Sequence, residues 1–257
     1  MRRPRLAITR AHRGPAIALG YAAFCLVYLG APHLSWKPPA VLAPTALDQA
    51  IPFLPWTILV YLGQFPFLFF TLWGGTGDGA RTRTFAGLAA ATLLATAVFV
   101  AWPTTGTRPD PRRAGAWAPL YRLVHRVDVP TNWLPSLHVA LAWVAVGGYA
   151  GRGPRSRRLA QAGAAAITLS TLTTGQHVLV DVAGGLLVAG LARGIVEAGR
   201  RPMAGSPSNA RSVQPTVSTS TPISGDWSCQ AGRTTGSAVI RGPAALTAPG
   251  ARGRVPP

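Results

Sequence analysis

The chain has 257 residues, of which 48% are hydrophobic and only 12% are charged. Charged residues make up about a quarter of an ordinary soluble domain, so this low share argues against a soluble fold. The net charge of +18 would suit a nucleic-acid-binding protein, but the arginines cluster between uncharged runs, so we expect no nucleic-acid partner.

Six apolar runs are candidates for membrane-spanning helices. A helix needs about 20 mostly apolar residues to cross a bilayer. The first three runs meet this requirement clearly, whereas the fourth and fifth are short or rich in Ala, Gly and Thr. The sequence therefore predicts an all-α bundle of six transmembrane helices within a membrane domain at 15–201. In chain order, the runs are 15–34, 51–73, 84–103, 136–151, 159–176 and 177–197.

The arginines that flank these runs fall mainly on one side of the predicted membrane. They occur in the N-terminal segment 1–14, after the second and fourth runs, and after the sixth. Cytoplasmic loops carry an excess of Lys and Arg. We therefore expect both termini to be cytoplasmic in a multi-pass protein of the plasma or inner membrane. The run at 15–34 exceeds a signal-peptide core of about 7–15 residues and is interpreted as a retained span.

The loop 104–135 departs from this charge pattern. It is predicted to face outward, yet it contains five arginines. An arginine-rich outer loop runs against the usual topogenic bias, which indicates another use for these side chains, such as binding phosphate or lipid headgroups. The five residues are Arg108, Arg112, Arg113, Arg122 and Arg126.

The C-terminal segment 202–257 differs in composition from the rest of the chain. It is rich in Pro, Ser, Thr, Gly and Ala and shows little periodicity. Such a segment cannot bury enough apolar surface to offset the entropy of ordering it. We therefore expect it to be disordered.

Alternating helices bring several polar residues to the outer face. Arg108 lies just beyond the outer end of the third run, and His138 lies at the outer start of the fourth. His177 lies at the outer start of the sixth run, and Asp181 follows four residues later, on the same face of a helix. A carboxylate at one ring nitrogen stabilises the imidazolium and leaves the other nitrogen as a nucleophile or base. The alternative is a structural polar pair that joins two helices.

The segment "PSLH" at 135–138 adds possible partners for this pair. Pro135 suits the first turn of a helix, where free amides and the Ser136 hydroxyl could bind an anion. His138 could protonate a leaving oxygen. Arg108 could hold phosphate oxygens with a bidentate fork.

These stretches resemble the three motifs of the type 2 phosphatidic acid phosphatase superfamily. The family pattern is Lys-x6-Arg-Pro, Pro-Ser-Gly-His and Ser-Arg-x5-His-x3-Asp. The matching segments are Thr107-Arg108-Pro109, "PSLH" and "STLTTGQHVLVD" at 170–181. Together with "PSLH", the stretch "LDQAIPFLPWTILVY" at 47–61 is similar to the inositol phosphorylceramide synthase-like (inositolphosphotransferase) branch.

The resemblance implies a lipid-phosphate phosphatase or phosphotransferase with an extracytoplasmic active site. His177 would attack phosphorus to form a phosphohistidine, Asp181 would orient it, and His138 would protonate the leaving group. Water or another alcohol would then attack the phosphoenzyme. No metal or other cofactor is implied, because arginine and helix amides supply positive charge. The substrate-binding residues implied are Arg108, Ser136 and Ser170.

Three positions depart from the family pattern. Ala101 and Thr171 stand where the pattern has Lys and Arg, and Leu137 replaces Gly. Losing one donor to a transition-state oxyanion costs about 2.7–4 kcal/mol. A catalytically silent homologue that binds lipid phosphate is therefore one alternative, unless other outer-loop arginines substitute. The candidates for that substitution are Arg112, Arg113, Arg122 and Arg126.

A metal-dependent membrane enzyme or transporter is the other alternative. His138, His177 and Asp181 are residue types that ligate zinc, although Arg108 nearby would repel a cation. Sensitivity to chelators separates this alternative from the phosphohistidine scheme, which predicts none.

Other features of the sequence are given structural interpretations. The segment 120–128, "LYRLVHRVD", is predicted to be a short amphipathic helix at the membrane interface. We interpret His125 within it as a surface residue, and Gly184, Gly185, Gly190 and Gly194 as sites of close helix packing. Tryptophans near the predicted span ends are interpreted as an interfacial aromatic belt: Trp56, Trp73, Trp102, Trp117 and Trp133.

Overall fold

The computed structural model describes residues 7–74 and 77–199. The chain divides into two units, 1–206 and 207–257, and every described residue belongs to the first. The prediction of disorder for 202–257 lies outside the described residues, as do residues 1–6.

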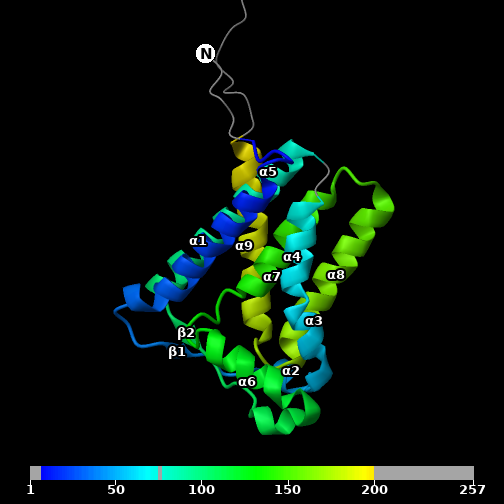
Figure 1. Ribbon diagram of the computed structural model, residues 1–257. Coiled ribbons are helices and arrows are strands. Elements are labelled where there is room, and N and C mark those ends of the chain that lie inside the picture. Colours follow the sequence, from blue (N-terminus) through cyan, green and yellow to red (C-terminus); the bar gives the residue numbers. More distant parts are fainter. Residues whose placement is uncertain (1–6, 75–76, 200–257) are drawn as a thin grey trace, which may run out of the picture. The chain divides into compact units, whose positions relative to one another are not determined.

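The described residues are mostly helical, and six helical segments run alternately between two ends of a bundle (Figure 1). Each predicted apolar run corresponds to one of these segments, with boundaries shifted by a few residues. The segments are α1 (Arg13–Leu34); η1 (Pro55–Thr57) with α3 (Ile58–Leu62) and α4 (Gln64–Trp73); α5 (Asp78–Ala101); α7 (Leu137–Val146) with η3 (Gly147–Tyr149); α8 (Pro154–Thr173); and α9 (Leu179–Ala198).

The second segment is interrupted rather than continuous. The break between α3 and α4 falls at Gly63, three residues before Pro66. Proline has no N–H, so the carbonyl of Leu62 lacks its usual helix partner four residues on. The predicted run 51–73 therefore contains an irregular turn at Gly63, although 55–73 as a whole is long and apolar enough to cross a membrane.

Four helices are long and apolar enough to cross a membrane, as is typical of a membrane protein. They cover 13–34, 55–73, 78–101 and 179–198. The stretch 137–149 is a shorter apolar helix. α8 does not join the four, since Arg155, Arg157 and Arg158 occupy its first two turns. The predicted count of six transmembrane helices is therefore not confirmed.

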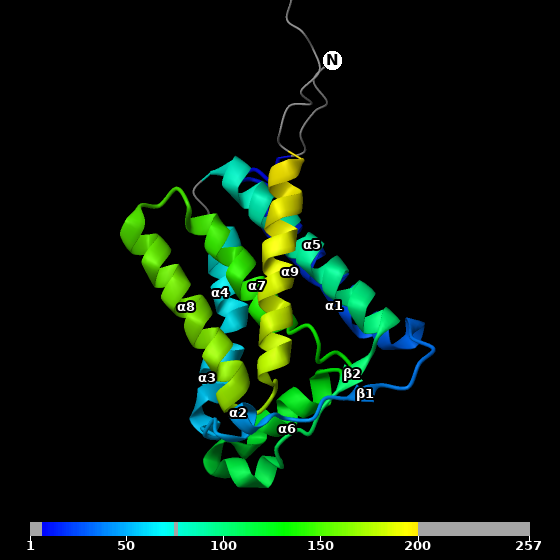
Figure 2. The same cartoon turned by 180° about the vertical axis from the view of Figure 1, so that it is seen from behind.

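α7 lies at the centre of the bundle. It contacts α4, α5, α8 and α9, and the two opposite views show these helices around it (Figures 1 and 2). Eight of its ten residues are buried, including Ala140, Ala142 and Ala145. Small side chains allow neighbouring helices to approach closely, so a short helix can be enclosed on several sides.

The outer helices expose apolar side chains instead of polar ones. Exposed apolar surface on this scale marks contact with a membrane or a partner, and lipid is the surrounding that suits helices of this composition. Examples on α1, α4, α5, α8 and α9 are Leu26, Phe70, Leu93, Leu169 and Leu187.

The longer connecting segments, 35–54 and 102–136, gather at the end of the bundle where α8 ends and α9 begins (Figure 1). β1 (Ala40–Val41) pairs in parallel with β2 (Thr104–Thr105), a small addition to the all-α prediction. The same end holds α2 (Ala46–Gln49), η2 (Pro111–Trp117) and α6 (Ala118–Val127). Loops far apart in sequence thus surround the start of α9.

α6 has the predicted amphipathic character. Tyr121 and Val124 are buried, whereas Arg122, Leu123 and Arg126 are exposed. The helix therefore packs one face on the domain, and its location at a membrane interface stays a prediction.

Candidate active site

His177 lies in the turn that joins α8 to α9. Gly175 adopts a positive φ of 66°, which glycine reaches without steric cost. The amides of Gln176 and His177 then both donate to the carbonyl of Thr171, each at 3.1 Å. This turn ends α8 and places His177 two residues before the first residue of α9.

His177 and Asp181 form the predicted pair. Nδ1 of His177 lies 3.2 Å from Oδ2 of Asp181, and the amide of Val178 donates to the same oxygen at 3.1 Å. Asp181 is completely buried, and the His177 side chain is 9% exposed. His177 precedes the helix rather than lying on it, because Asp181 reaches back as an N-terminal capping residue. The carboxylate binds Nδ1, so Nε2 is the nitrogen left for chemistry.

The starts of α7 and α9 pack directly against each other. The amide of Ser136 donates to the carbonyl of Asp181 at 2.9 Å. A Cβ at Gly185 would lie 2.5 Å from the Ser136 carbonyl oxygen, and one at Gly184 would lie 2.8 Å from Leu134. This confirms close packing at both glycines. Gly190 and Gly194 would meet nothing within 4 Å, so the packing prediction is wrong for these two positions within this chain.

Ser136 caps α7 instead of opening toward an anion. Its hydroxyl accepts the amide of Val139 at 3.5 Å, and the residue is completely buried. The helix therefore begins at Leu137, one residue after the cap, and Pro135 precedes the cap rather than forming the first turn.

His138 occupies the first turn of α7 between aromatic rings. Its ring stacks on Tyr61 with centroids 4.0 Å apart and meets the edge of Phe65 at 6.4 Å. Nε2 is buried and makes no hydrogen bond within the described residues. The ring also interacts electrostatically with His177. The structure therefore brings the two predicted histidines together.

Arg108 is held by an aspartate that the sequence analysis did not identify. Its guanidinium donates to Asp128 at 2.7 Å and to the carbonyl of Val129 at 3.3 Å. The hydroxyl of Tyr28 donates to the other oxygen of Asp128. Nε of Arg108 is buried without a hydrogen bond in the described part of the chain. Asp128 and Arg108 also interact with Tyr61, which links this ion pair to His138.

Ser170 does not reach the site. It is 2% exposed, and its hydroxyl donates to the carbonyl of Ile167 at 2.6 Å. Thr171 is completely buried, and its hydroxyl donates to Thr168 at 2.7 Å. Both hydroxyls bond within α8, so the predicted substrate contact of Ser170 has no support in this geometry.

One cation lies near Ala101, and another lies at the pocket. Nζ of Lys37 donates to the carbonyl of Ala101 at 3.2 Å. Of the outer-loop arginines, Arg113 lies 5.9 Å above the ring of Phe53, a residue of the pocket described next. Arg112 instead pairs with Asp110 at 3.1 Å and is almost fully exposed.

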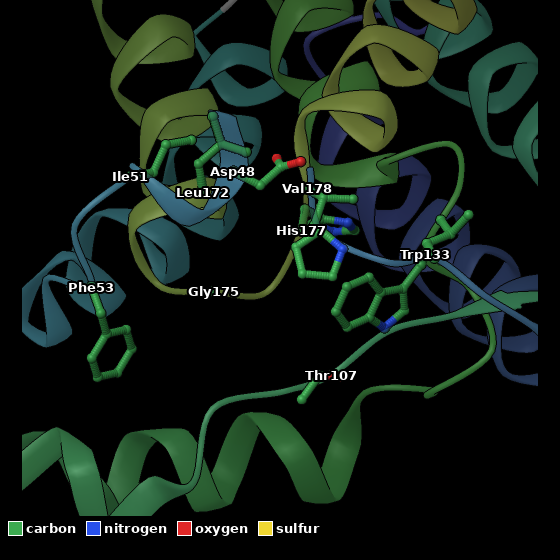
Figure 3. A pocket seen from close by; sticks show the side chains of 11 residues that line it. Asp48, Ile51, Phe53, Thr107, Trp133, Leu172, Gly175, His177 and Val178 are labelled. Carbon is green, nitrogen blue, oxygen red and sulfur yellow. The ribbon is translucent and has the colours of Figure 1, made fainter. Parts of the chain in front are cut away.

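A cavity of about 150 Å³ opens beside His177 (Figure 3). The ring of Trp133 lies 6.0 Å from that of His177 and is 3% exposed, so the aromatic-belt interpretation is wrong for this tryptophan. Gly106 makes room for it, since a Cβ there would lie 2.0 Å from the indole. Among the described residues, the titratable side chains in the lining are those of His177 and Asp48. The lining residues are Leu42, Pro44, Asp48, Ile51, Phe53, Thr107, Trp133, Leu172, Gly175, His177 and Val178.

His125 is more closely connected to the site than a surface residue would be. It is half-buried, and its Nε2 lies 3.4 Å from Nε2 of Gln176, the residue before His177. Burial lowers the pKa of His125, and the positive charge of Arg108 lowers it further, although Asp128 acts in the opposite direction. Through Gln176, His125 thus contacts the turn that carries His177.

Within residues 7–74 and 77–199, no three His, Cys, Asp or Glu side chains are placed to hold one metal ion. The chemistry that the arrangement offers is that of a buried His–Asp pair with a second histidine and an arginine nearby. Such a set can attack, protonate and bind a phosphoryl group.

Comparison with known proteins identifies the family. A family model described as the PAP2 superfamily, the type 2 phosphatidic acid phosphatases, matches residues 33–195. Neither the curated proteins nor the solved structures contain a match to the chain. The matched stretch covers more than half of the sequence and contains Arg108, Ser136, His138, Ser170, His177 and Asp181, the six predicted site residues. The chain therefore belongs to the PAP2 superfamily, whose members are phosphatases and phosphotransferases.

Proposed function

We propose that this protein transfers the phosphoryl group of a membrane lipid phosphate, through a phosphohistidine at His177, to water or to an alcohol. The observation that carries the proposal is the buried pair of His177 and Asp181 beside a pocket. The lining contains Leu42, Ile51 and Leu172, an apolar surrounding that suits an amphiphile.

The reaction follows from the roles of three side chains. The lone pair of Nε2 of His177 attacks phosphorus, and the bond from phosphorus to the leaving oxygen breaks. His138 gives that oxygen its proton. Asp181 stabilises the positive charge that develops on the His177 ring. An acceptor hydroxyl then loses its proton to His138 and attacks phosphorus, which breaks the N–P bond and restores both histidines.

Arg108 supplies positive charge for the phosphoryl oxygens. Its Nε is a buried donor with no hydrogen bond among the described residues, so an oxyanion would satisfy it. Asp128 holds the same guanidinium through Nη2, at 2.7 Å. The proposal needs no metal, since the guanidinium of Arg108 provides positive charge for the phosphoryl oxygens.

In the proposed membrane arrangement, all six helical segments cross, both termini are cytoplasmic and the site faces outward. The arginine clusters support this orientation through the positive-inside rule. Leu137 in "PSLH" and the stretch 47–61 favour the inositolphosphotransferase branch of the family.

The test is phosphoryl release and transfer by the detergent-purified protein on a panel of lipid phosphates with EDTA present. We expect turnover to survive EDTA and to disappear in His177→Ala, because the variant lacks the proposed nucleophile. The matched control is His33→Ala, which removes an exposed histidine in the last turn of α1. The product separates hydrolysis from transfer.

Three results would contradict the proposal. Loss of activity in EDTA would favour the metal-dependent alternative. Full activity in His177→Ala would mean that another residue is the nucleophile. A well-folded protein without turnover on any substrate would favour a silent lipid-binding homologue.

A further inference from the structure

Asp48 is fixed by its own short helix. The hydroxyl of Thr45 accepts the amide of Asp48 at 3.3 Å, and Oδ2 of Asp48 accepts the amide and hydroxyl of Thr45 at 2.8 and 2.6 Å. This capping box holds the carboxylate in one orientation at the start of α2. The other oxygen, Oδ1, is left to act elsewhere.

That second oxygen binds the start of α9. The amide of Leu179 donates to Oδ1 of Asp48 at 2.7 Å, although the two residues are 131 positions apart. Burial would raise the pKa of Asp48, but the hydrogen bonds from Thr45 and Leu179 together hold that pKa below its ordinary value. The bond therefore joins a charged carboxylate to a helix N-terminus, where negative charge is favoured.

Two carboxylates from different elements thus fix the first turn of α9. Asp181 accepts a hydrogen bond from the amide of Val178, and Asp48 accepts one from the amide of Leu179. His177 directly precedes these two amides. Asp48 also lines the cavity that His177 lines (Figure 3), so it is close to the reacting ring without bonding to it.

The same loop is tied to the end of α8. The amide of Leu54 donates to the carbonyl of Thr173 at 2.8 Å, and the hydroxyls of Thr57 and Thr173 are 2.9 Å apart. Hydrogen bonds therefore connect the segment 45–57 to both ends of the turn 173–179. Held at both ends, that turn has little freedom to move His177.

We propose that Asp48 is a positioning residue for phosphoryl transfer, which holds the first turn of α9 and thereby the ring of His177 in its pocket. Asp48 belongs to none of the three motifs and acts through the backbone of Leu179. The inference rests on the proposed function, because it assigns Asp48 a role in that reaction.

The test compares Asp48→Ala, Asp48→Asn and the control Asp110→Ala in purified full-length protein. Asp110 lies at the same end of the bundle and also accepts a hydrogen bond from a backbone amide, that of Arg112 at 2.9 Å. Within the described residues it makes no hydrogen bond to α9. We would measure kcat, KM and the unfolding temperature. We would also measure hydrogen–deuterium exchange of the peptide that contains Leu179.

Asp48→Ala should lower kcat about 10- to 100-fold with a smaller change in KM, because small misplacements of a reacting group have effects of this size. Asp48→Asn keeps one oxygen for the Leu179 amide but places an NH2 group where Oδ2 accepts the Thr45 amide, so it should lower kcat less than Asp48→Ala does. Exchange at Leu179 should rise in Asp48→Ala alone. Asp110→Ala should match wild type throughout.

Two results would overturn the inference. One is unchanged kcat or unchanged exchange at Leu179 in Asp48→Ala. The other is a loss of kcat that follows the fall in unfolding temperature equally in the Ala and Asn variants, which would show a role in folding alone. An inactive wild-type protein would refute the proposed function, while the exchange measurement would still decide whether Asp48 anchors α9.

Discussion

At the scale of single residues, the reactivity of His177 depends on what surrounds each ring nitrogen. Asp181 is completely buried and bonds to Nδ1. A buried carboxylate is costly unless it is paired. Here the histidine and the Val178 amide both bond to Oδ2, whereas Oδ1 makes no hydrogen bond among the described residues. Through Oδ2, the negative charge of Asp181 acts on the ring of His177. A carboxylate in this position stabilises the positive charge that a nucleophilic histidine develops.

The absence of the family's Lys and Arg at Ala101 and Thr171 raises the question of which cation replaces them. Thr171 is buried within α8 and has no access to the pocket. Arg113 lies over Phe53 at the pocket, whereas Arg112 is bound to Asp110 and exposed. Of these two arginines, Arg113 is therefore the better placed to add a contact to a phosphorylated substrate beside that of Arg108.

Arg113→Ala should raise KM for a lipid phosphate about tenfold, because a charge-assisted hydrogen bond to an anion contributes about 1.5–3 kcal/mol. Arg112→Ala is the matched control and should leave KM near the wild-type value. Steady-state kinetics of the two variants on the same substrate provide the measurement. Equal effects in both variants would show that neither arginine contacts the substrate specifically.

At the scale of elements, the site depends on how closely α7 and α9 approach. The amide of Ser136 binds the carbonyl of Asp181, so the two helix starts are locked together. Gly185 permits this contact because any side chain would meet the Ser136 carbonyl and Val139. The packing of two helices therefore fixes the position of His138 relative to His177.

Gly185→Ala should lower the unfolding temperature and the activity together. Its Cβ would lie 2.5 Å from the Ser136 carbonyl oxygen and 2.9 Å from Val139, and overpacking of this kind costs about 1–3 kcal/mol. Gly190→Ala, on the same helix with nothing within 4 Å, is the control. It should be neutral or stabilising by up to about 1 kcal/mol through helix propensity. Thermal unfolding in detergent distinguishes the two, and a Gly185→Ala protein as stable as wild type would refute the packing argument.

At the scale of the whole molecule, the open question is how many helical segments cross the membrane. Four are long and apolar enough by themselves. α7 is short, but it is enclosed by α4, α5, α8 and α9. A helix shielded by protein does not need the full apolar length that lipid contact demands. The bundle as a whole is therefore compatible with six crossings.

Cysteine accessibility tests the six-span arrangement. In a background with Cys25→Ala and Cys229→Ala, we would introduce Ala116→Cys in η2 or Ala150→Cys after η3, both at exposed positions. Six crossings with cytoplasmic termini predict that a membrane-impermeant maleimide labels position 116 in intact cells. Position 150 should react only after permeabilisation. Labelling of both positions from one side would show that α7 and α8 form a hairpin that does not cross.

The sequence by itself determined the features that depend on local spacing and composition. The six apolar runs became six helical segments, because apolar length and helix formation are local properties. The pairing of His177 with Asp181 followed from their separation of four residues, because side chains at this spacing are neighbours on a helix. The contact also forms here, where His177 lies just before the helix. The convergence of Arg108, His138 and His177 at one end followed from the alternation of helices.

Only the tertiary structure decided the contacts that join distant loops. Three of these contacts link segments that share no sequence periodicity. They are the hydrogen bond from Leu179 to Asp48, the ion pair of Arg108 with Asp128, and the packing of buried Trp133 beside His177. A helix face can be counted from the sequence, but the course of a loop depends on turns and caps that the folded neighbours select. Ser170 had a clear motif position, but in the folded protein its side chain is buried and its hydroxyl donates to the carbonyl of Ile167 within α8.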